Sequence, residues 1–382
     1  MTGKVIAQLG ATIGRQFSYE LLQAVSQLDA STLQRALGGL VEAEIVYQRG
    51  LPPQAYYFFK HALIQDAAYE SLLKSTRQQY HQRIAQVLEE RFPDTVETQP
   101  ELVAYHGMEA GLTAQSVSYW HKAAQRAVER SAHVEAIRHL TKGLELLKVV
   151  PETPQRLQQE VDMLITLGAS LIAVKGWAAP EVEQTYSRAQ HLCAHLEDPY
   201  QLFPVLRGLW SYYFMRAELQ TTHALGKQLL SLAQQVQDSA MLIAAHHALG
   251  LTLFFMGAVA SAQTHFAQGI ALYDPKQHRA LAFRYGDDMG VICRSHGAWT
   301  LWHLGYLHQG LVQNDEAVIL AQQINYPFSL VHALELAAVL HLFRREGQAA
   351  QERAEAAIRL ATEQGFPFWR VFGSMLHGWV LA

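Results

Sequence analysis

Residues 246–275 read HHALGLTLFFMGAVASAQTHFAQGIALYDP. This stretch has the spacing of two helices that meet over small side chains, and Asp274-Pro275 closes the unit. One such pair cannot bury its apolar face alone, so the pattern predicts a stack of similar pairs. The residues that fit the pattern are His246, Gly250, Gly257, Ala262, Phe266 and Gly269.

The same pattern recurs along the chain. Weaker units centre on Gly168, Trp210 and Ala298. The small-residue position in the first helix of each pair recurs about every 40 to 48 residues. It falls at residues 124, 168, 210, 250, 298, 338 and 378. This period exceeds that of a tetratricopeptide repeat, so each helix should be longer by about one turn. The clearest further units contain Trp120, Ala124, Ala136 and Gly143, and Leu334, Ala338, Ala350, Ala354 and Ala357.

The composition excludes several classes of protein. Of 382 residues, 50% are hydrophobic and 17% are charged, which excludes global disorder. With a net charge of -4, the chain as a whole lacks the excess of positive charge that is typical of nucleic-acid-binding proteins. Cys193 and Cys293 are too few for a disulfide scaffold or a cysteine-built metal site. No run of about 18 uncharged apolar residues occurs. We therefore expect a cytoplasmic protein without cofactor, metal or membrane contact.

The first 95 residues differ from the rest. Three short helical patterns, over 3–12, 18–27 and 31–43, precede two β-prone runs around Gly50-Leu51-Pro52-Pro53. Three helices and a hairpin are the layout of a winged helix. Two helices follow, over 61–73 and 75–92, and the first should pack as core through Ala62, Leu63, Ala67, Ala68 and Leu72.

The predicted fold is mainly α. We expect a winged-helix-like domain over 1–95 and a right-handed tetratricopeptide-like α-solenoid over 96–382, with about six helix pairs. The last helix, from Phe366 to Leu381, is strongly apolar, whereas an array normally ends in a polar capping helix. We therefore expect a fragment, or a chain end that another copy covers.

Motifs for an independent catalytic centre are absent from the sequence. Gly10-Ala-Thr-Ile-Gly14-Arg15 lacks the Lys-Ser/Thr of a phosphate loop, and no H-E-x-x-H or G-x-S-x-G occurs. The predicted recognition helix over 31–44 offers Arg35 but also Glu42 and Glu44, so we do not expect it to bind DNA.

Three segments resemble the C-terminal half of bacterial signalling proteins that join an adenylate/guanylate cyclase domain, an AAA-like STAND ATPase and a tetratricopeptide array. They are GATIGRQFSYELL (10–22), FFKHALIQDAAYESLL (58–73) and ATEQGFP (361–367). The resemblance implies a non-catalytic regulatory arm, with an upstream nucleotide-binding module as partner. It also implies that His61 contacts the nucleotide in some state of the module.

The repeat register predicts a binding groove for a peptide, protein or small ligand along the first helices. An insertion over 277–290, with a turn at Tyr285-Gly286-Asp287-Asp288, would place charged residues at one end of this groove if it folds inward. Two alternatives remain: a STAND-type transcriptional regulator that contacts DNA, and a hydrolase that uses His247 and Asp287. The groove residues are Arg207, Phe214, His247, Phe254, Trp299, Trp302, His303, His332 and Glu335, and those of the insertion are Arg279, Arg284, Asp287 and Asp288.

Overall fold

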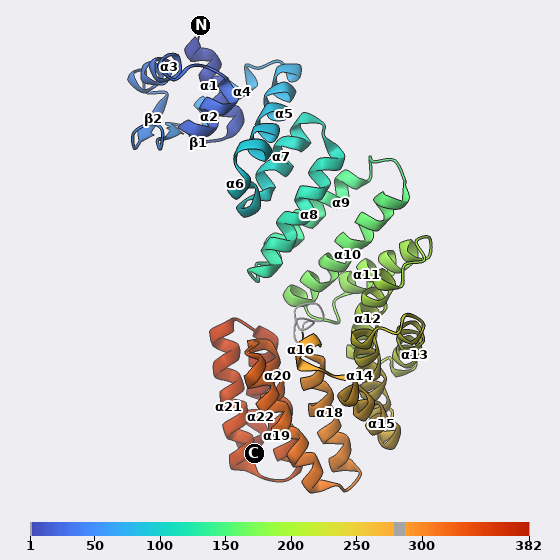
Figure 1. Ribbon diagram of the computed structural model, residues 1–382. Coiled ribbons are helices and arrows are strands. Elements are labelled where there is room, and N and C mark those ends of the chain that lie inside the picture. Colours follow the sequence, from blue (N-terminus) through green and yellow to red (C-terminus); the bar gives the residue numbers. More distant parts are fainter. Residues whose placement is uncertain (1, 279–286, 382) are drawn as a thin grey trace. The chain divides into compact units, whose positions relative to one another are not determined.

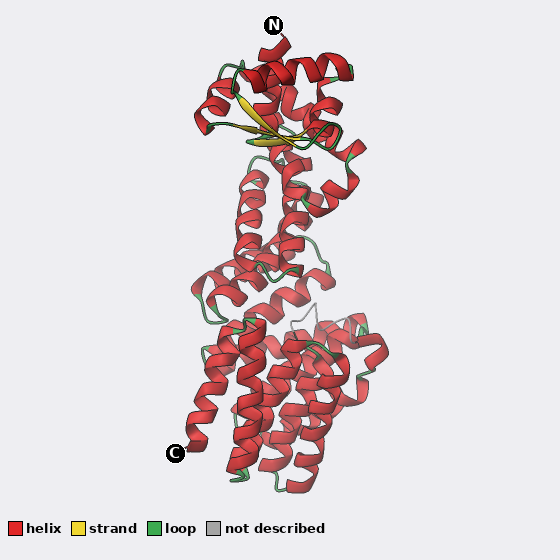
Figure 2. Ribbon diagram, turned by 90° about the vertical axis from the view of Figure 1, so that its left-hand side faces the viewer, coloured by secondary structure: helices red, strands yellow, loops and turns green. Residues whose placement is uncertain are grey.

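The structure is a computed structural model that describes residues 2–278 and 287–381. Most of the described residues are helical, and they form two compact units (Figures 1 and 2). Unit 1 comprises Met1–Ser170 and unit 2 comprises Leu171–Ala382. Arg279 and Arg284, two of the predicted insertion residues, lie outside the described residues.

Unit 1 begins with helices around a small sheet, which Figure 2 shows in yellow. The sheet is antiparallel in the order β1-β3-β2. The predicted hairpin is confirmed, because Val46 of β2 lies opposite Phe59 of β3. The elements are α1 (Thr2–Ile13), β1 (Gln16–Ser18), α2 (Tyr19–Ser26), α3 (Ala30–Glu42), β2 (Val46–Arg49), β3 (Tyr56–Phe59), α4 (Ala62–Glu70) and α5 (Lys74–Arg91).

The third strand, β1, was not predicted. Its three residues are too few to show alternation, but Phe17 lies opposite Tyr57 and the two rings stack at 5.8 Å between centroids. The Ser18 side chain then accepts a hydrogen bond from the Leu21 N–H and caps α2. A strand therefore occupies the position directly before the second predicted helix.

The prediction that helix 61–73 packs as core is wrong for most of its residues. No residue of α4 is buried, and Leu63 is largely exposed, whereas Leu72, which follows α4, is buried as predicted. Only one side, with Ile64, Ala68 and Tyr69, packs against the core of unit 1. That core is filled instead by α5, through Ile84 and other residues, because α5 lies against α1 and α2.

The rest of unit 1 consists of helix pairs. The predicted unit around Trp120 is α8 with α9, and its Ala124 and Ala136 are buried. At Gly143 a Cβ would lie 3.3 Å from that of Trp120 and 2.3 Å from the Met163 Cε atom. The helices are α6 (Pro93–Thr98), α7 (Pro100–Ala110), α8 (Thr113–Glu129), α9 (His133–Leu147) and α10 (Pro154–Lys175).

Among the described residues, α10 is the one helix long and apolar enough to cross a membrane by length and composition alone. It contains Glu160 and Asp162, and its Val161 and Met163 are fully buried in the protein. Helices in the core of a protein pass the same test of length and composition.

Unit 2 continues the pairs as a stack of antiparallel helices (Figure 1). The predicted positions 124 and 168 fall in α8 and α10. Those in unit 2 fall in α12, α14, α18, α20 and α22, and the first four of these helices each pack on the helix that follows them. Its helices are α11 (Pro180–Cys193), α12 (Pro199–Met215), α13 (Leu219–Val236), α14 (Ser239–Phe255), α15 (Val259–Leu272), α16 (Pro275–His278), α18 (Met289–His303), α19 (Leu307–Ile324), α20 (Pro327–Phe343), α21 (Gly347–Gln364) and α22 (Pro367–Leu381).

Three first helices begin at an aspartate cap. The carboxylates of Asp198, Asp238 and Asp288 accept hydrogen bonds from backbone N–H groups of α12, α14 and α18, respectively. Trp210 stands at the predicted small-residue position of α12, and α12 comes closest to the preceding helix, α11. Gly208 makes the close approach there, because a Cβ on it would lie 2.4 Å from the Tyr186 ring.

We expect Gly208→Ala to destabilise the protein by about 1–3 kcal/mol, because the added methyl group overlaps the buried Tyr186 ring. Gly378→Ala is the matched control, since no atom lies within 4 Å of the added methyl group on α22. Urea unfolding of both variants measures the difference. Equal stability of the two variants would show that the Gly208 contact does not hold α12 in place.

Candidate functional site: aromatic and histidine side chains on the first helices of unit 2

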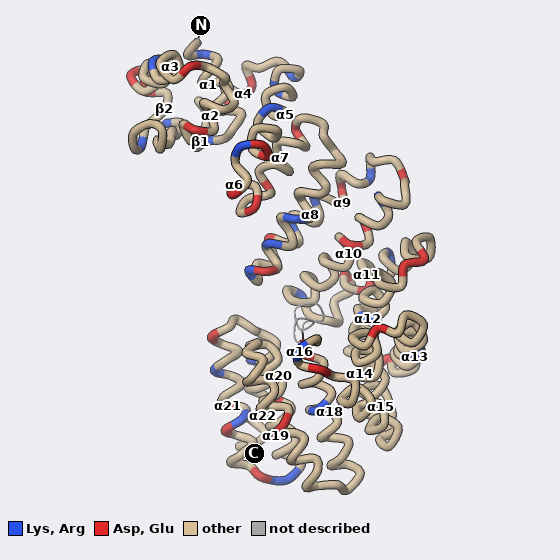
Figure 3. The backbone as a smooth tube through the Cα atoms, in the orientation of Figure 1, with Lys and Arg blue, Asp and Glu red and all other residues tan. Residues whose placement is uncertain are grey.

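The site is carried by α12, α14, α18 and α20, the first helices of four successive pairs. Figure 3 shows that α14 and α20 are almost free of charged residues. α14 has none, and α20 has only Glu335. A helix that is apolar all round lies between others in a protein core. Polar groups on these helices are therefore held in fixed positions by their neighbours.

The α12 end of the site is built around Trp210. The Arg207 guanidinium lies over the Trp210 ring at 4.1 Å, and Phe214 stacks on the same ring at 5.1 Å between centroids. The Trp210 indole N–H donates to the Thr252 hydroxyl of α14 at 3.0 Å. Two predicted residues, Arg207 and Phe214, are thus brought together by a tryptophan that the sequence had placed at a small-residue position.

Ring contacts continue across α14 and α18. Phe214 meets Phe255 at 5.4 Å, and the neighbouring Phe254 meets His303 at 5.1 Å. His303 in turn lies 5.2 Å from the Phe343 ring at the end of α20. All these distances join ring centroids. Phe214, Phe254 and His303 therefore belong to one continuous row, as the repeat register predicted.

The two predicted tryptophans of α18 differ in their surroundings. Trp299 is buried, and its indole N–H donates to the Leu336 carbonyl at 3.0 Å. Trp302 is half-buried, and the Arg344 guanidinium lies 5.7 Å from its ring centroid. Trp299 therefore belongs to the core between helices, whereas Trp302 remains accessible.

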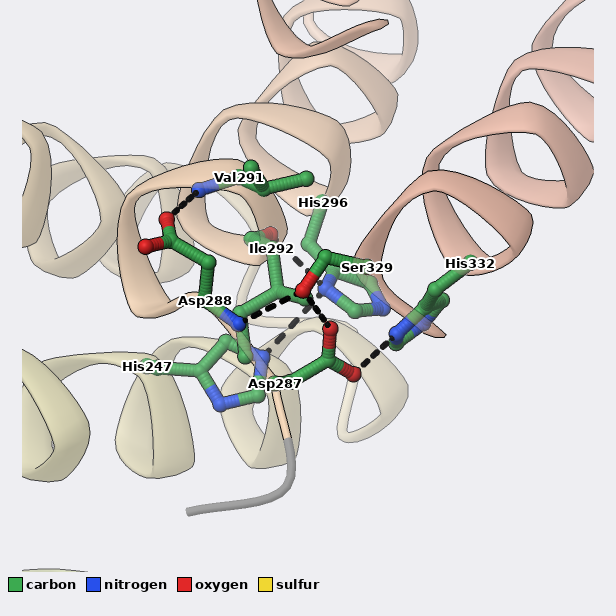
Figure 4. A network of polar contacts seen from close by, with 8 residues as sticks. All are labelled: His247, Asp287, Asp288, Val291, Ile292, His296, Ser329 and His332. Atoms are coloured by element: carbon green, nitrogen blue, oxygen red, sulfur yellow. Dashed lines mark hydrogen bonds and ion pairs between the residues drawn. The ribbon is translucent and has the colours of Figure 1, made fainter. Parts of the chain in front are cut away.

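A buried polar network crosses the site from α14 to α20 (Figure 4). His247 Nε2 lies 3.3 Å from His296 Nδ1, and His296 Nδ1 lies 3.0 Å from the Ile292 carbonyl oxygen. Because a carbonyl only accepts, His296 Nδ1 must carry the hydrogen and His247 Nε2 must accept. Burial lowers the pKa of His247 well below its usual range and the pKa of His296 to about 3, so both are neutral near pH 7.

The second half of the network is centred on Asp287. His332 Nδ1 donates to one carboxylate oxygen at 2.6 Å, and the Ser329 hydroxyl donates to the other at 3.0 Å. Ser329 accepts from the Asp288 N–H, and the Asp288 carboxylate caps α18 through the Val291 N–H. The predicted insertion residues Asp287 and Asp288 are thus buried anchors that join α18 to α20.

This geometry differs from that of a hydrolytic triad. The Ser329 hydroxyl donates to Asp287, whereas a nucleophilic serine donates to a histidine that the carboxylate orients. His247 is bonded to His296 and not to Asp287. Among the described residues, no group of three or more His, Cys, Asp or Glu side chains is arranged to hold a metal ion.

Glu335 was predicted to face the groove, and the structure corrects this prediction. The side chain is fully buried, beside Gly373 of α22, and neither carboxyl oxygen has a hydrogen-bond partner among the described residues. Burial raises its pKa to about 9. The prediction failed because it assumed a charged carboxylate, whereas the buried acid is neutral and far less costly to bury.

The remaining predicted residue, His61, lies in unit 1. It is exposed at the start of α4, and its side chain makes no capping hydrogen bond. The neighbouring Lys60 forms an ion pair with Glu44. The role of His61 at a nucleotide stays a prediction.

The sequence reasoning missed Trp210, His296 and Ser329. Trp210 and His296 lie on predicted first helices, but their contacts join helices about 40 residues apart. No local sequence pattern indicates contacts between residues so far apart in the chain. Ser329 follows Pro327 by two residues at the start of α20, and a search for serine near predicted helix starts would have found it.

Comparison with known proteins supports the fold. No family model matches the chain. The aspartyl phosphate phosphatase F of Bacillus subtilis aligns over 99% of this chain and 93% of its own, with TM-score 0.52 and 10% identity. A Rap protein complexed with Competence and Sporulation Factor covers 100% and 98%, with TM-score 0.51 and 11% identity. The chain is a tetratricopeptide-like helical solenoid.

One sequence relative bears on the length of the chain. An uncharacterized protein of Rhizobium meliloti (strain 1021) is 23% identical over 347 residues, which are 90% of this chain and 33% of that protein. The chain thus spans about a third of the length of this curated relative. A STAND protein of Pyrococcus horikoshii with a tetratricopeptide repeat sensor has TM-score 0.47 and 11% identity, over 100% of this solenoid chain and 59% of its own.

We expect Glu335→Gln to stabilise the protein increasingly as the pH rises. The folded pKa of about 9 lies above the usual 4.5, so the unfolded chain ionises first and stability falls between these values. The glutamine variant lacks this loss and should gain about 1 kcal/mol or more at pH 8, but little at pH 4. Urea unfolding at both pH values tests this, and a gain of equal size at both would contradict it.

For His296 the change of folding stability with pH has the opposite sign. Its folded pKa lies far below 6.5, so protonation of the unfolded chain lowers stability as the pH falls below about 6.5. One such histidine contributes a loss of about 1.4 kcal/mol at pH 5.5. The free energy of unfolding of each protein is measured by urea unfolding at pH 7.5 and at pH 5.5. We expect it to fall less between these pH values in His296→Gln than in the natural chain. An unchanged loss would mean that His296 titrates normally.

Proposed function

We propose that the chain is a non-catalytic sensor and protein-interaction arm of a multidomain signalling ATPase or nucleotide cyclase. It binds a peptide, protein or small ligand along the first helices of unit 2. The observation that carries this proposal is a row of accessible apolar side chains at the C-terminal ends of four successive first helices. These residues, called the rim row below, are Met215, Phe255, Leu304 and Phe343.

The rim row has the chemistry of a partner surface. Phe255 is 52% exposed and Phe343 is 40% exposed, although each is in ring contact with groove residues behind it. Accessible apolar residues aligned over several elements mark interaction sites more often than scattered ones do. Trp302 and the Arg344–Glu346 ion pair lie at one end and add polar groups at the margin. Aromatic anchors with a polar margin suit a peptide or a partner helix.

The polar network behind the row supports a binding role more than a catalytic one. His247 and His296 are neutral, and Asp287 is engaged by two donors. A network whose members bond to one another fixes the spacing of α14, α18 and α20. The helices are then already ordered before a ligand binds at the rim row, so binding does not carry the free-energy cost of ordering them.

The proposal assigns nucleotide chemistry to an upstream module. We propose that α1 to β3 form a winged helix that packs on this module, with His61 near the nucleotide. The order α1-β1-α2-α3-β2-β3 and the three-stranded sheet support this assignment. A cytoplasmic location belongs to the same proposal, and it is in keeping with Cys193 and Cys293 forming no disulfide among the described residues.

Peptide is the ligand class that we favour. The Rap protein of similar fold was solved with Competence and Sporulation Factor. At 11% identity this likeness concerns the fold alone, so the ligand class of this chain rests on the rim row. The DNA-binding alternative is less well supported. α3 offers Arg35 alone as a basic residue, and the hairpin's Lys60 is paired with Glu44.

The test is to measure ATP binding and hydrolysis by the purified chain, and by the same chain joined to the reading frame that precedes it. We expect the chain alone to be inert and the longer protein to be active. Phe255→Asp and Phe343→Asp should change the regulated rate of the longer protein several-fold, because a charge in the rim row opposes docking of an apolar ligand.

Ile319→Asp is the control, because Ile319 is a similarly exposed apolar residue on α19, outside the rim row. Nucleotide turnover by the chain alone would contradict the proposal. An equal effect of all three substitutions would also contradict it, since the rim row would then have no special role. A salt-dependent gel shift with the chain tests the DNA alternative directly.

A further inference from the structure

Unit 1 contains a cleft with a volume of about 470 Å³ between α6 and α8, called the α6–α8 cleft below. Residues of α6 form one wall and residues of α8 form the other, and Glu89 of α5 and Pro100 of α7 complete the lining. Helices α5 and α8 both pack on α7, which holds the two sides of the cleft together. Clefts of about 300 to 1,000 Å³ are typical of small-molecule sites.

The α8 wall is a polar stripe on a helix that is docked by its other side. Tyr119, Lys122, Arg126 and Glu129 follow one another at intervals of three or four residues, so they lie along one side of α8. The buried residues of α8, among them Trp120, lie on the opposite side. Figure 3 shows Lys and Arg positions along α8 and acidic positions on α6.

Hydrogen bonds fix α8 against α5 at the cleft. The Tyr119 hydroxyl donates to the Glu89 carboxylate at 2.6 Å, and the Gln115 amide donates to both Glu89 oxygens at 2.7 and 2.8 Å. Burial and the Glu89 carboxylate raise the pKa of Tyr119 to about 12, so its hydroxyl remains a donor near pH 7. The cleft is therefore shaped before a ligand enters it, and Glu89 is already engaged by three hydrogen bonds.

Arg126 lacks the partner that its position calls for. Its Nε atom is buried and has no hydrogen-bond partner among the described residues. Glu129 lies three residues away on the same helix, yet the described residues show no ion pair of either Lys122 or Arg126. A buried donor of a charged group is costly to leave unpaired. A carboxylate is the group that matches the planar guanidinium best, through two parallel hydrogen bonds.

The rest of the lining narrows the class of ligand. Glu97 on α6 and Glu129 on α8 are exposed acids of the cleft, which repel a doubly charged anion and attract an ammonium group. Pro93, Val96 and Pro100 supply apolar surface. The cleft thus offers a partner for a carboxylate, partners for an ammonium group and contacts for an apolar body.

We propose that the α6–α8 cleft binds a zwitterionic ligand of the size of a dipeptide. Its carboxylate pairs with Arg126 and Lys122, and its ammonium group lies near Glu97 and Glu129. A ligand that contacts both walls would hold α6, the short helix before the helix pairs, against α8. The site lies in unit 1, and the proposal does not depend on what the rim row binds.

The experiment uses the apolar dipeptide leucyl-leucine as the probe, titrated into the intact chain by isothermal titration calorimetry at pH 7. We expect saturable binding. The N-acetylated and the C-amidated dipeptides should each bind at least about tenfold more weakly, because each lacks one of the two charges. Arg126→Met should weaken binding of leucyl-leucine at least about tenfold for the same reason. Lys122→Met is a second variant in case Arg126→Met fails to fold, and circular dichroism checks both.

Arg138→Met is the matched control, because Arg138 is an exposed arginine of α9 outside the lining of the cleft. It should bind the dipeptide as the natural chain does, and so should Phe255→Asp in the rim row. Absence of saturable binding by the folded natural chain would overturn the proposal, as would unchanged binding by the folded Arg126 and Lys122 variants. Equal affinity for either blocked dipeptide would exclude a zwitterion. Loss of binding in Phe255→Asp would place the dipeptide in unit 2 and overturn the proposal too.

Discussion

Close approach of neighbouring helices over small residues is the constraint on which the rest of the structure depends. Gly208 lies against the Tyr186 ring, Gly250 against Phe266, and Gly143 against Met163. At each place a Cβ would come within about 3 Å of another side chain. Interiors packed at this density do not yield easily to extra atoms. The glycines therefore set the distance between helices and, through it, the geometry of the first helices.

That geometry explains why polar groups are tolerated inside the stack. His247, His296 and Glu335 lie on helices that are otherwise nearly uncharged, and burial keeps all three neutral. Asp287 is partnered by His332 and Ser329 instead. Neutral or fully bonded groups are much less costly to bury than free charges. The accessible rim row then remains as apolar surface of unit 2 that a partner could contact.

Elements with a local sequence signal were predicted correctly, whereas elements that depend on tertiary contacts were not. The hairpin over 46–59 was predictable, because β-prone residues flank a Gly-Pro-Pro turn within one short segment. Strand β1 was not, because three residues carry no period and only pairing with β3 defines it. Helix α4 was expected in the core from its alanines, but alanine occurs on either side of a helix, and Leu63 points away from the core.

The sequence alone determined the helical class and the repeat period. Small and large residues at fixed helical spacing form a pattern within a single segment, and this pattern recurs in each helix pair. The tertiary structure decided which of those residues are accessible. Trp299 is buried and Trp302 is half-exposed, although they are three residues apart on one helix. Their surroundings come from Leu336 and Arg344 on the next pair, and contacts across such separations follow from packing rather than from local sequence.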